Sequence, residues 1–216
     1  MATRRRALES AAALIPPDPT LDDLREAAAH CQACPLWQSG TQTVFGEGER
    51  GAAALFVGEQ PGDQEDRVGK PFVGPAGQLL DRALQEAEID RTKIYVTNAV
   101  KHFKWIAKGS RRIHQSPNKG EVTACHPWLE AEIALLKPPV IVCLGAVAAR
   151  ALLGEEFRVT RQRGQFVSSP RAPWVMATIH PSAILRIPEE EARDAAFLHL
   201  VADLKQVAAK IASPSP

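Results

Sequence analysis

Several side chains that could perform chemistry gather in one turn of the chain. Residues 58–66 read Gly-Glu-Gln-Pro-Gly-Asp-Gln-Glu-Asp, so two glycines, a proline and four acids share one short segment. Such a turn can bring backbone N–H groups close to a planar ligand and direct a carboxylate at it. The alternative is an acidic surface turn. Phe72 follows between glycines and prolines and not within a periodic apolar face, which favours a stacking platform over a core side chain.

The four cysteines include one closely spaced pair. Cys31 and Cys34 are two residues apart, so both thiolates can face one metal centre. A disulfide framework is unexpected without a secretion signal, and metal ligation is the leading interpretation of the pair. Cys143 lies inside an apolar run, where a free thiol packs as a small hydrophobic side chain.

Positive charge is concentrated although the net charge is only +1. Residues 101–120 and 158–171 contain lysines and arginines without any acid. Contacts to a nucleic-acid backbone need such local charge, so the two segments favour a phosphate-binding face. The alternative is a pair of solvated loops.

The composition is typical of one soluble domain. The chain has 216 residues, of which 45% are hydrophobic and 24% charged, and no apolar run approaches the about 20 residues that cross a bilayer. An arginine run precedes an alanine-rich stretch as in a secretory signal, but Glu9 and Ser10 interrupt it. We expect residues 1–19 to form a flexible, basic, proline-rich tail and residues 20–216 to form a single domain.

Apolar runs alternate with segments of helical periodicity, which predicts an α/β fold with three layers and a central, mainly parallel, four-stranded sheet. The predicted strands are residues 53–57, 94–100, 140–144 and 174–179, and the main predicted helices are residues 78–87, 121–136, 146–153 and 189–211. The acidic turn, Asn98 and His180 each follow a predicted strand. Ligands bind outside the carboxyl ends of such strands, so we expect these clusters to converge on one edge.

Four motifs taken together resemble those of the family-4 uracil-DNA glycosylases. They are GEQPGDQED, GKPFVGPAGQLLD, YVTNAVK and HPSAILR, and the resemblance extends from Cys31 to the last predicted helix. It implies the uracil-DNA glycosylase fold and a 4Fe-4S cluster that explains the cysteine pair. His102 stands where the family has a cysteine, and imidazole can replace thiolate in such clusters. The ligands would be Cys31, Cys34, His102 and Cys125.

Three departures from the family pattern resemble its UdgX branch. They are His102, Gln60 in place of the usual alanine, and a longer segment that contains Arg-Arg-Ile-His at residues 111–114. Members of that branch excise uracil and become joined to the abasic sugar through the histidine of this segment, here His114. The catalytic candidates are therefore His114, Glu59, His180 and Gln60. The substrate-binding candidates are Asp63, Asp66, Phe72, Asn98, Lys101, Arg112 and Ser182.

The roles follow from the charges that develop when uracil leaves deoxyribose. His180 would donate a hydrogen bond to the departing base, Glu59 would stabilise the cationic sugar, and Asn98 would match the pyrimidine edge. We expect a single-turnover glycosylase that forms a covalent DNA adduct through His114. The alternatives are a hydrolytic family-4 enzyme with turnover and a noncatalytic nucleic-acid-binding protein with an iron-sulfur cluster. The expected partner is uracil-containing DNA, preferably single-stranded, and the expected state is a monomer in the bacterial cytoplasm without membrane contact.

Overall fold

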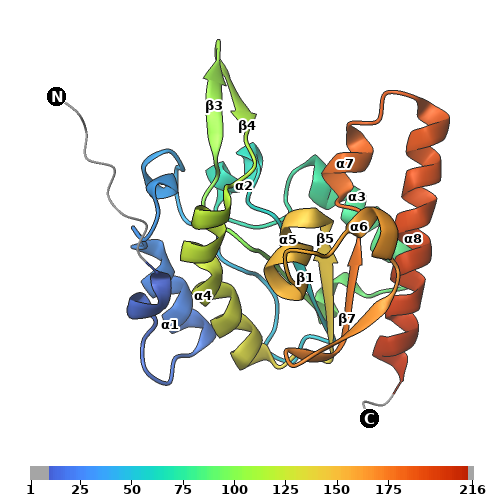
Figure 1. Cartoon of the computed structure of the whole chain (residues 1–216), viewed down its shortest axis with the longest axis horizontal. Coiled ribbons are helices and arrows are strands. Elements are labelled where there is room, and N and C mark those ends of the chain that lie inside the picture. The colour runs from blue at the N-terminus through green and yellow to red at the C-terminus, as the bar shows by residue number, and fades with distance from the viewer. Residues whose placement is uncertain (1–9, 214–216) are drawn as a thin grey trace.

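A parallel sheet forms the centre of the molecule in the computed structural model, which describes residues 10–213 (Figure 1). Within these residues the sheet has five strands in the order β2-β1-β5-β7-β6. Only β6 is antiparallel to its neighbour. The strands are β1 (Ala54–Gly58), β2 (Ile94–Asn98), β5 (Val140–Leu144), β6 (Phe166–Ser169) and β7 (Ala172–Thr178).

The prediction of an α/β fold with a mainly parallel sheet is confirmed, but the number of predicted strands is wrong. The additional strand, β6, lies at the edge of the sheet and pairs only with β7. It is short and only partly buried, so it lacks the continuous apolar run that identified the other four strands. An edge strand of this kind is difficult to distinguish from a loop by pattern.

Helices cover both faces of the sheet because alternate strand residues point to opposite sides. Phe56 packs with α3 (Pro75–Glu86), α7 (Pro181–Leu185) and α8 (Glu190–Ala212). Its neighbour Leu55 packs with α4 (Lys119–Leu136) and α5 (Gly145–Leu153) on the other face. Burial on both faces explains the uninterrupted apolar runs of these strands.

The N-terminal segment packs against α4 in a third, smaller cluster. Helix α1 (Leu21–Ala29) begins with a capping box between Thr20 and Asp23, and it delivers the cysteine pair at its end. The short helix η1 (Ala11–Leu14) places Ala11 in the same cluster, fully buried. Part of the segment expected to be a tail therefore packs on the domain, whereas the arginine run of residues 4–6 lies outside the described residues.

A β-hairpin projects from the body beside α2 (Asp63–Val68) (Figure 1). Its antiparallel strands, β3 (Trp105–Lys108) and β4 (Arg111–His114), lie in the first basic segment, which the sequence suggested to be a loop. Its tip is exposed, so no buried apolar pattern marked its strands. The remaining elements are η2 (Pro35–Gln38), η3 (Arg91–Lys93) and α6 (Val159–Gln162).

Two arginines of the second basic segment are held by acids on neighbouring helices. Arg163 forms an ion pair with Asp203 on α8, and Arg171 pairs with Glu130 on α4. These guanidinium groups therefore stabilise contacts between elements. Among the described residues, no helix has the length and apolar character that a membrane crossing requires.

Candidate active site

The three polar clusters converge at the carboxyl edge of the sheet, as predicted. They enclose a cavity of about 80 Å³. The side chains come from the turn after β1, the end of β2, the foot of the hairpin and the turn after β7. The lining residues are Gln60, Pro61, Gly62, Glu65, Phe72, Ala76, Asn98, His114, His180 and Ser182.

Asn98 and Phe72 crowd the end of β1 so closely that the residue there must be glycine. Gly58 is paired in register with Asn98. A Cβ atom on Gly58 would lie 2.3 Å from Asn98 Oδ1 and 2.8 Å from the Phe72 ring. The amide and the aromatic ring are therefore held at the cavity by the packing of the main chain.

Phe72 adopts a backbone conformation that is costly for a bulky residue. Its φ angle is 57°, and Gly77 makes this possible because a Cβ there would lie 1.8 Å from the Phe72 carbonyl oxygen. The ring lies 6.2 Å from the His180 ring at an interplanar angle of 27°. Such strain is typical of functional sites, and the geometry fits the expected stacking platform.

His180 is held as a neutral hydrogen-bond donor that faces the cavity. Its Nδ1 accepts the backbone N–H of Ser182 at 3.1 Å, so in the neutral ring the proton resides on Nε2. Burial, together with the smaller effects of Arg186 and His114, lowers the pKa of His180 to about 4. At neutral pH the ring therefore offers an N–H group without a charge.

Glu59 and His114 face each other at the mouth of the cavity. The distance from His114 Nε2 to Glu59 Oε1 is 3.6 Å, and this buried oxygen has no hydrogen-bond partner among the described residues. Burial lowers the pKa of His114, and the adjacent Glu59 carboxylate opposes that change. The pair thus combines an uncharged imidazole with a carboxylate oxygen that is free to accept a hydrogen bond.

Gln60 connects the turn after β1 to both ends of the hairpin segment. Its Nε2 donates to the carbonyl oxygens of Lys104 at 3.2 Å and Gln115 at 3.0 Å, and its Oε1 accepts from the Lys104 N–H at 3.2 Å. These bonds occupy the amide. Gln60 therefore lines the cavity and also ties the turn after β1 to the foot of the hairpin.

Arg112 anchors the hairpin to α2 and is not free to bind phosphate. Its guanidinium forms ion pairs with Asp63 and Asp66, the latter at 2.6 Å. Asp66 is fully buried and also accepts from the backbone N–H of Thr41 at 2.8 Å. The two aspartates and Arg112 were expected to contact substrate, but in the structure they contact one another.

Lys101 lies in the interior and not at the cavity. Its side chain is 1% exposed and forms an ion pair with Glu132 at 2.6 Å. The structure thus places Lys101 away from the cavity where the sequence predicts a contact with substrate. No pattern in the sequence around Lys101 marks its buried partner on α4.

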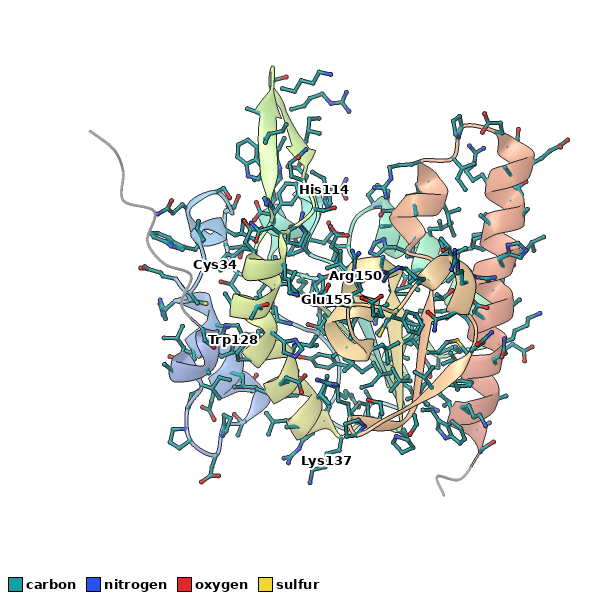
Figure 2. All side chains as sticks on the ribbon, viewed as in Figure 1. Cys34, His114, Trp128, Lys137, Arg150 and Glu155 are labelled. Carbon is teal, nitrogen blue, oxygen red and sulfur yellow. The ribbon has the colours of Figure 1, made fainter. Side chains whose placement is uncertain are left out.

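Three of the four predicted metal ligands share one buried cluster. Cys31, Cys34 and Cys125 pack together beside Trp128, and Figure 2 places Cys34 and Trp128 on the α1 side of α4. Trp128 Nε1–H donates to Cys31 Sγ at 3.4 Å, and the Lys101 backbone N–H donates to Cys125 Sγ at 3.3 Å. Bonds of this type stabilise thiolate ligands.

His102 is buried nearby but is turned toward another partner. Its Nε2 lies 3.0 Å from Thr43 Oγ1. In the described part of the chain, no three histidine, cysteine or acidic side chains are arranged to hold a single metal ion. The ligands of a cluster bind different iron atoms and need not converge on one point. The three thiols therefore suit a cluster, and Cys143 packs separately in the sheet core, as expected.

Two site residues were missed in the sequence. Glu65 lines the cavity and accepts the Gly74 N–H at 2.8 Å, which joins the turn after β1 to the Phe72 segment. Arg186 affects the pKa of both His114 and His180 through its charge. Both residues belong to motifs that carry the family resemblance. Their place in these motifs is the one feature of the sequence that points to a role at the site.

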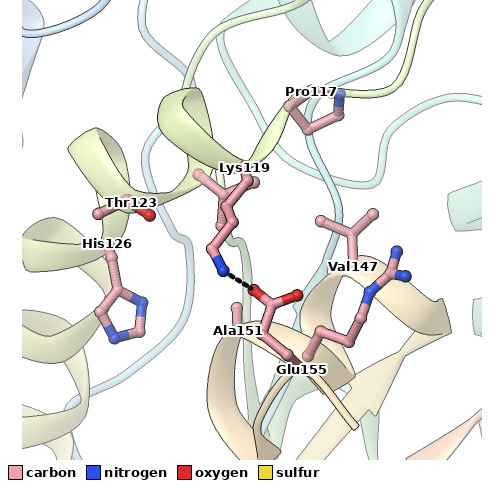
Figure 3. Close-up of a pocket in the computed structure, with 9 residues that line it drawn as sticks. Pro117, Lys119, Thr123, His126, Val147, Ala151 and Glu155 are labelled. Atoms are coloured by element: carbon pink, nitrogen blue, oxygen red, sulfur yellow. Dashed lines mark ion pairs between the residues drawn. The ribbon is translucent and has the colours of Figure 1, made fainter. Parts of the chain in front are cut away.

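A larger cavity of about 360 Å³ lies between α4 and α5 (Figure 3). One ion pair joins two of its lining residues, Lys119 and Glu155, at 3.3 Å, and His126 pairs at 2.7 Å with Glu130 outside the lining. It contains none of the glycine, amide and aromatic features that suit a planar ligand. We therefore assign the candidate chemistry to the smaller cavity.

Comparisons with known proteins identify the family of this chain. A family model described as the uracil DNA glycosylase superfamily matches residues 45–205. The type-4 uracil-DNA glycosylase of Thermotoga maritima is 37% identical over 174 residues, which cover 80% of this chain and 87% of that protein. That of Sulfurisphaera tokodaii is 35% identical over 177 residues, which cover 78% and 77%. The chain therefore belongs to the uracil DNA glycosylase superfamily.

Proposed function

We propose that this protein excises uracil from DNA. The observation that carries the proposal is the small cavity at the sheet edge, where Asn98, Phe72 and His180 surround the space for one planar ring. Its similarity to type-4 uracil-DNA glycosylases supports the same activity. Single-stranded DNA is the preferred substrate in this proposal, because a base without a pairing partner costs least to extrude.

Recognition of the base depends on Asn98 and Phe72. The amide of Asn98 presents a carbonyl and an NH₂ group, which match N3–H and O4 of uracil. Cytosine presents an amino group in place of O4, so it would leave buried polar groups unpaired. The Phe72 ring stacks on the extruded base.

Cleavage of the glycosidic bond separates charge, and the site has a group for each side. The bond electrons leave with the base, and the Nε2–H of His180 donates to the developing anion. Glu59 supplies a carboxylate opposite the sugar, which becomes cationic. Because His180 is uncharged at neutral pH, it stabilises the anion without repelling that sugar.

Hydrolysis is the outcome that the relatives favour. The Glu59 oxygen without a partner can accept a hydrogen bond from a water molecule. This bond directs a lone pair of the water oxygen at C1′ of the sugar. The abasic DNA then dissociates and the enzyme turns over.

Covalent capture by His114 is the second candidate, and the contact with Glu59 at 3.6 Å specifically favours it. A neutral imidazole next to the sugar competes with water through proximity, since effective molarities of oriented groups reach about 10⁵ M or more. The resulting C–N bond would make the reaction single-turnover, as in the UdgX branch.

One experiment tests the activity and separates the two outcomes. Wild-type protein is incubated with a uracil oligonucleotide, free uracil is quantified, and the mixture is run on a denaturing gel. Uracil release with turnover and no adduct would support hydrolysis. Release of one equivalent with a heat-stable adduct, absent in His114→Ser, would support capture. Absence of uracil release would contradict the proposed activity.

We further propose that Cys31, Cys34, Cys125 and His102 hold a 4Fe-4S cluster. The cluster would join α1 to α4 and the start of the hairpin segment. Purified protein should be brown and contain about four iron atoms per chain in this ligand scheme. Cys125→Ala should lose iron, whereas Cys143→Ala should retain it. Full iron in His102→Ala together with loss in Cys143→Ala would contradict the ligand assignment.

A further inference from the structure

A buried ion pair lies directly behind the base pocket. Lys101 and Glu132 are 1% and 0% exposed, and their charged atoms are 2.6 Å apart. Glu132 comes from α4, and its other oxygen accepts the Tyr95 hydroxyl at 3.0 Å and the Gly46 N–H at 3.2 Å. The uracil chemistry described above uses neither charge.

The Lys101 ammonium contacts the main chain of the residue that is proposed to recognise the base. Its Nζ donates to the Asn98 carbonyl oxygen at 2.8 Å and to Thr97 Oγ1 at 2.6 Å. Both acceptors belong to the last two residues of β2. The lysine thus folds back over the end of its own strand and fixes the peptide that follows Asn98.

The peptide between Asn98 and Ala99 is held at both of its polar groups. Its N–H, which belongs to Ala99, donates to the Gly58 carbonyl oxygen on β1 at 2.9 Å, and the next N–H, of Val100, donates to the Glu59 carbonyl oxygen at 3.0 Å. Its carbonyl oxygen accepts from the Lys101 ammonium, so Lys101 completes the set of contacts that orients this peptide. A hydrogen bond from a charged donor is shorter and stronger than one from a neutral donor. The Lys101 ammonium, which the buried Glu132 carboxylate holds in place, therefore fixes the Asn98 carbonyl group firmly.

Stability alone is a weak reason for a buried ion pair. Removing two charges from water costs several kcal/mol per ion in general, and apolar replacements of a whole pair are often equally stable. A role in positioning the residue that contacts the base explains the pair better. A displacement of about 1 Å in a reacting complex can lower the rate about 10²-fold.

We propose that the Lys101–Glu132 pair is a positioning device that sets Asn98 against the base and thereby determines selectivity for uracil. This inference rests on the proposed uracil excision. Lys101 does not touch the base. It acts through the Asn98 peptide.

The decisive variant removes both charges together. Lys101→Met alone would leave Glu132 buried without its partner, so loss of folding would be expected. In Lys101→Met/Glu132→Gln the glutamine oxygen can still accept from Gly46 and Tyr95. We expect this double variant to regain most of the melting temperature lost by the single variant.

The readouts are the single-turnover rate of uracil release, the Kd for the uracil oligonucleotide, and the rate ratio between uracil and cytosine substrates. The double variant should release uracil about 10–100-fold more slowly with a Kd within about twofold of wild type, because misplacement affects the reacting geometry. The rate ratio should fall. Val207→Ala, a core change in α8, controls for stability and should keep the wild-type rate and ratio below its melting temperature.

The outcomes separate this inference from the proposed function. A double variant with the wild-type rate and ratio would overturn the positioning role while leaving uracil excision intact. An equal loss of rate in Val207→Ala at matched stability would overturn it as well. Failure of wild-type protein to release uracil would instead remove the proposed function. In that case Asn98→Ala would change nothing either.

Discussion

Asn98 and His180 stand on main chain that the sheet fixes, whereas His114 stands on a hairpin that side chains hold in place. Asn98 ends β2 and His180 closely follows β7, and both strands belong to the main sheet and have core packing on both faces. His114 ends β4, which pairs only with β3, and its side chain is 41% exposed. One side of the cavity, formed by Asn98 and His180, is therefore fixed by the sheet, and we call it the rigid wall. The opposite side, formed by His114, depends on the position of the hairpin.

The contacts of the hairpin explain this difference. Gln60 binds its two ends, and Arg112 joins it to Asp63 and Asp66 on α2. Its outer residues are exposed, so the hydrophobic effect contributes little to its position. The position of the hairpin therefore depends mainly on these polar contacts.

The largest effect should come from the rigid wall. His180→Ala removes the whole ring, and with it the Nε2–H donor that the Ser182 N–H fixes in place. Loss of one such donor costs about 10²–10³-fold in rate, so uracil release should slow by that amount. Single-turnover release is the measurement, and DNA affinity should stay close to wild type. A loss below threefold would show that the base leaves without help from this ring.

A smaller effect should follow when the foot of the hairpin is released. Gln60→Ala removes three hydrogen bonds to Lys104 and Gln115, and trypsin can cut at the lysines and arginines of the hairpin. Cleavage there should be about 10-fold faster, because local opening costs about 1.4 kcal/mol less. Limited proteolysis followed by mass spectrometry measures it. Gln78→Ala, an exposed change on α3, should be cleaved by trypsin at the wild-type rate. Equal cleavage rates in the two variants would show that the Gln60 hydrogen bonds do not hold the foot of the hairpin.

The same contrast explains what the sequence could reveal. Buried strands such as β1 and β5 have continuous apolar runs, and their ends could be placed together because parallel strands share one edge. Asn98, Phe72 and His180 therefore came together as predicted. Glycine and proline around Phe72 marked its special backbone.

Contacts made by polar side chains across long separations could not be predicted. Arg112 and Lys101 belong to one basic segment, yet their partners lie on α2 and α4. A single sequence shows the charge of a residue but not which acid it will meet, so both arginine and lysine were assigned to substrate. The exposed hairpin was taken for a loop for a related reason, because it buries no apolar face.

A still smaller change in the rate of trypsin cleavage should distinguish an anchoring role of Arg112 from direct contact with DNA. Arg112→Ser removes the ion pairs to Asp63 and Asp66, whereas Arg111→Ser makes the same charge change at the exposed neighbouring position. Arg112→Ser should accelerate trypsin cleavage of the hairpin a few-fold, and Arg111→Ser should not. If Arg112 instead contacted phosphate, both variants would lower the salt dependence of DNA binding equally, with unchanged proteolysis.

The smallest effect concerns pH and compares the two histidines. Burial lowers the pKa of His180 to about 4, while the ordinary value in an unfolded chain is about 6.5. Between these values the unfolded chain binds a proton that the folded chain excludes, so stability rises with pH and is lost as pH falls below 6.5. Each pH unit in that window is worth at most about 1.4 kcal/mol, or about 3–6 °C in melting temperature for a chain of this size. From pH 7 to pH 5.5, wild type should therefore lose up to about 5 °C more than His180→Gln. His114→Gln should recover less of this loss, because His114 is partly exposed and Glu59 opposes the lowering of its pKa.

Equal pH profiles of melting temperature for wild type and His180→Gln would show that the His180 ring can be protonated in the folded state. The assignment of His180 as an uncharged donor on the rigid wall would then be wrong.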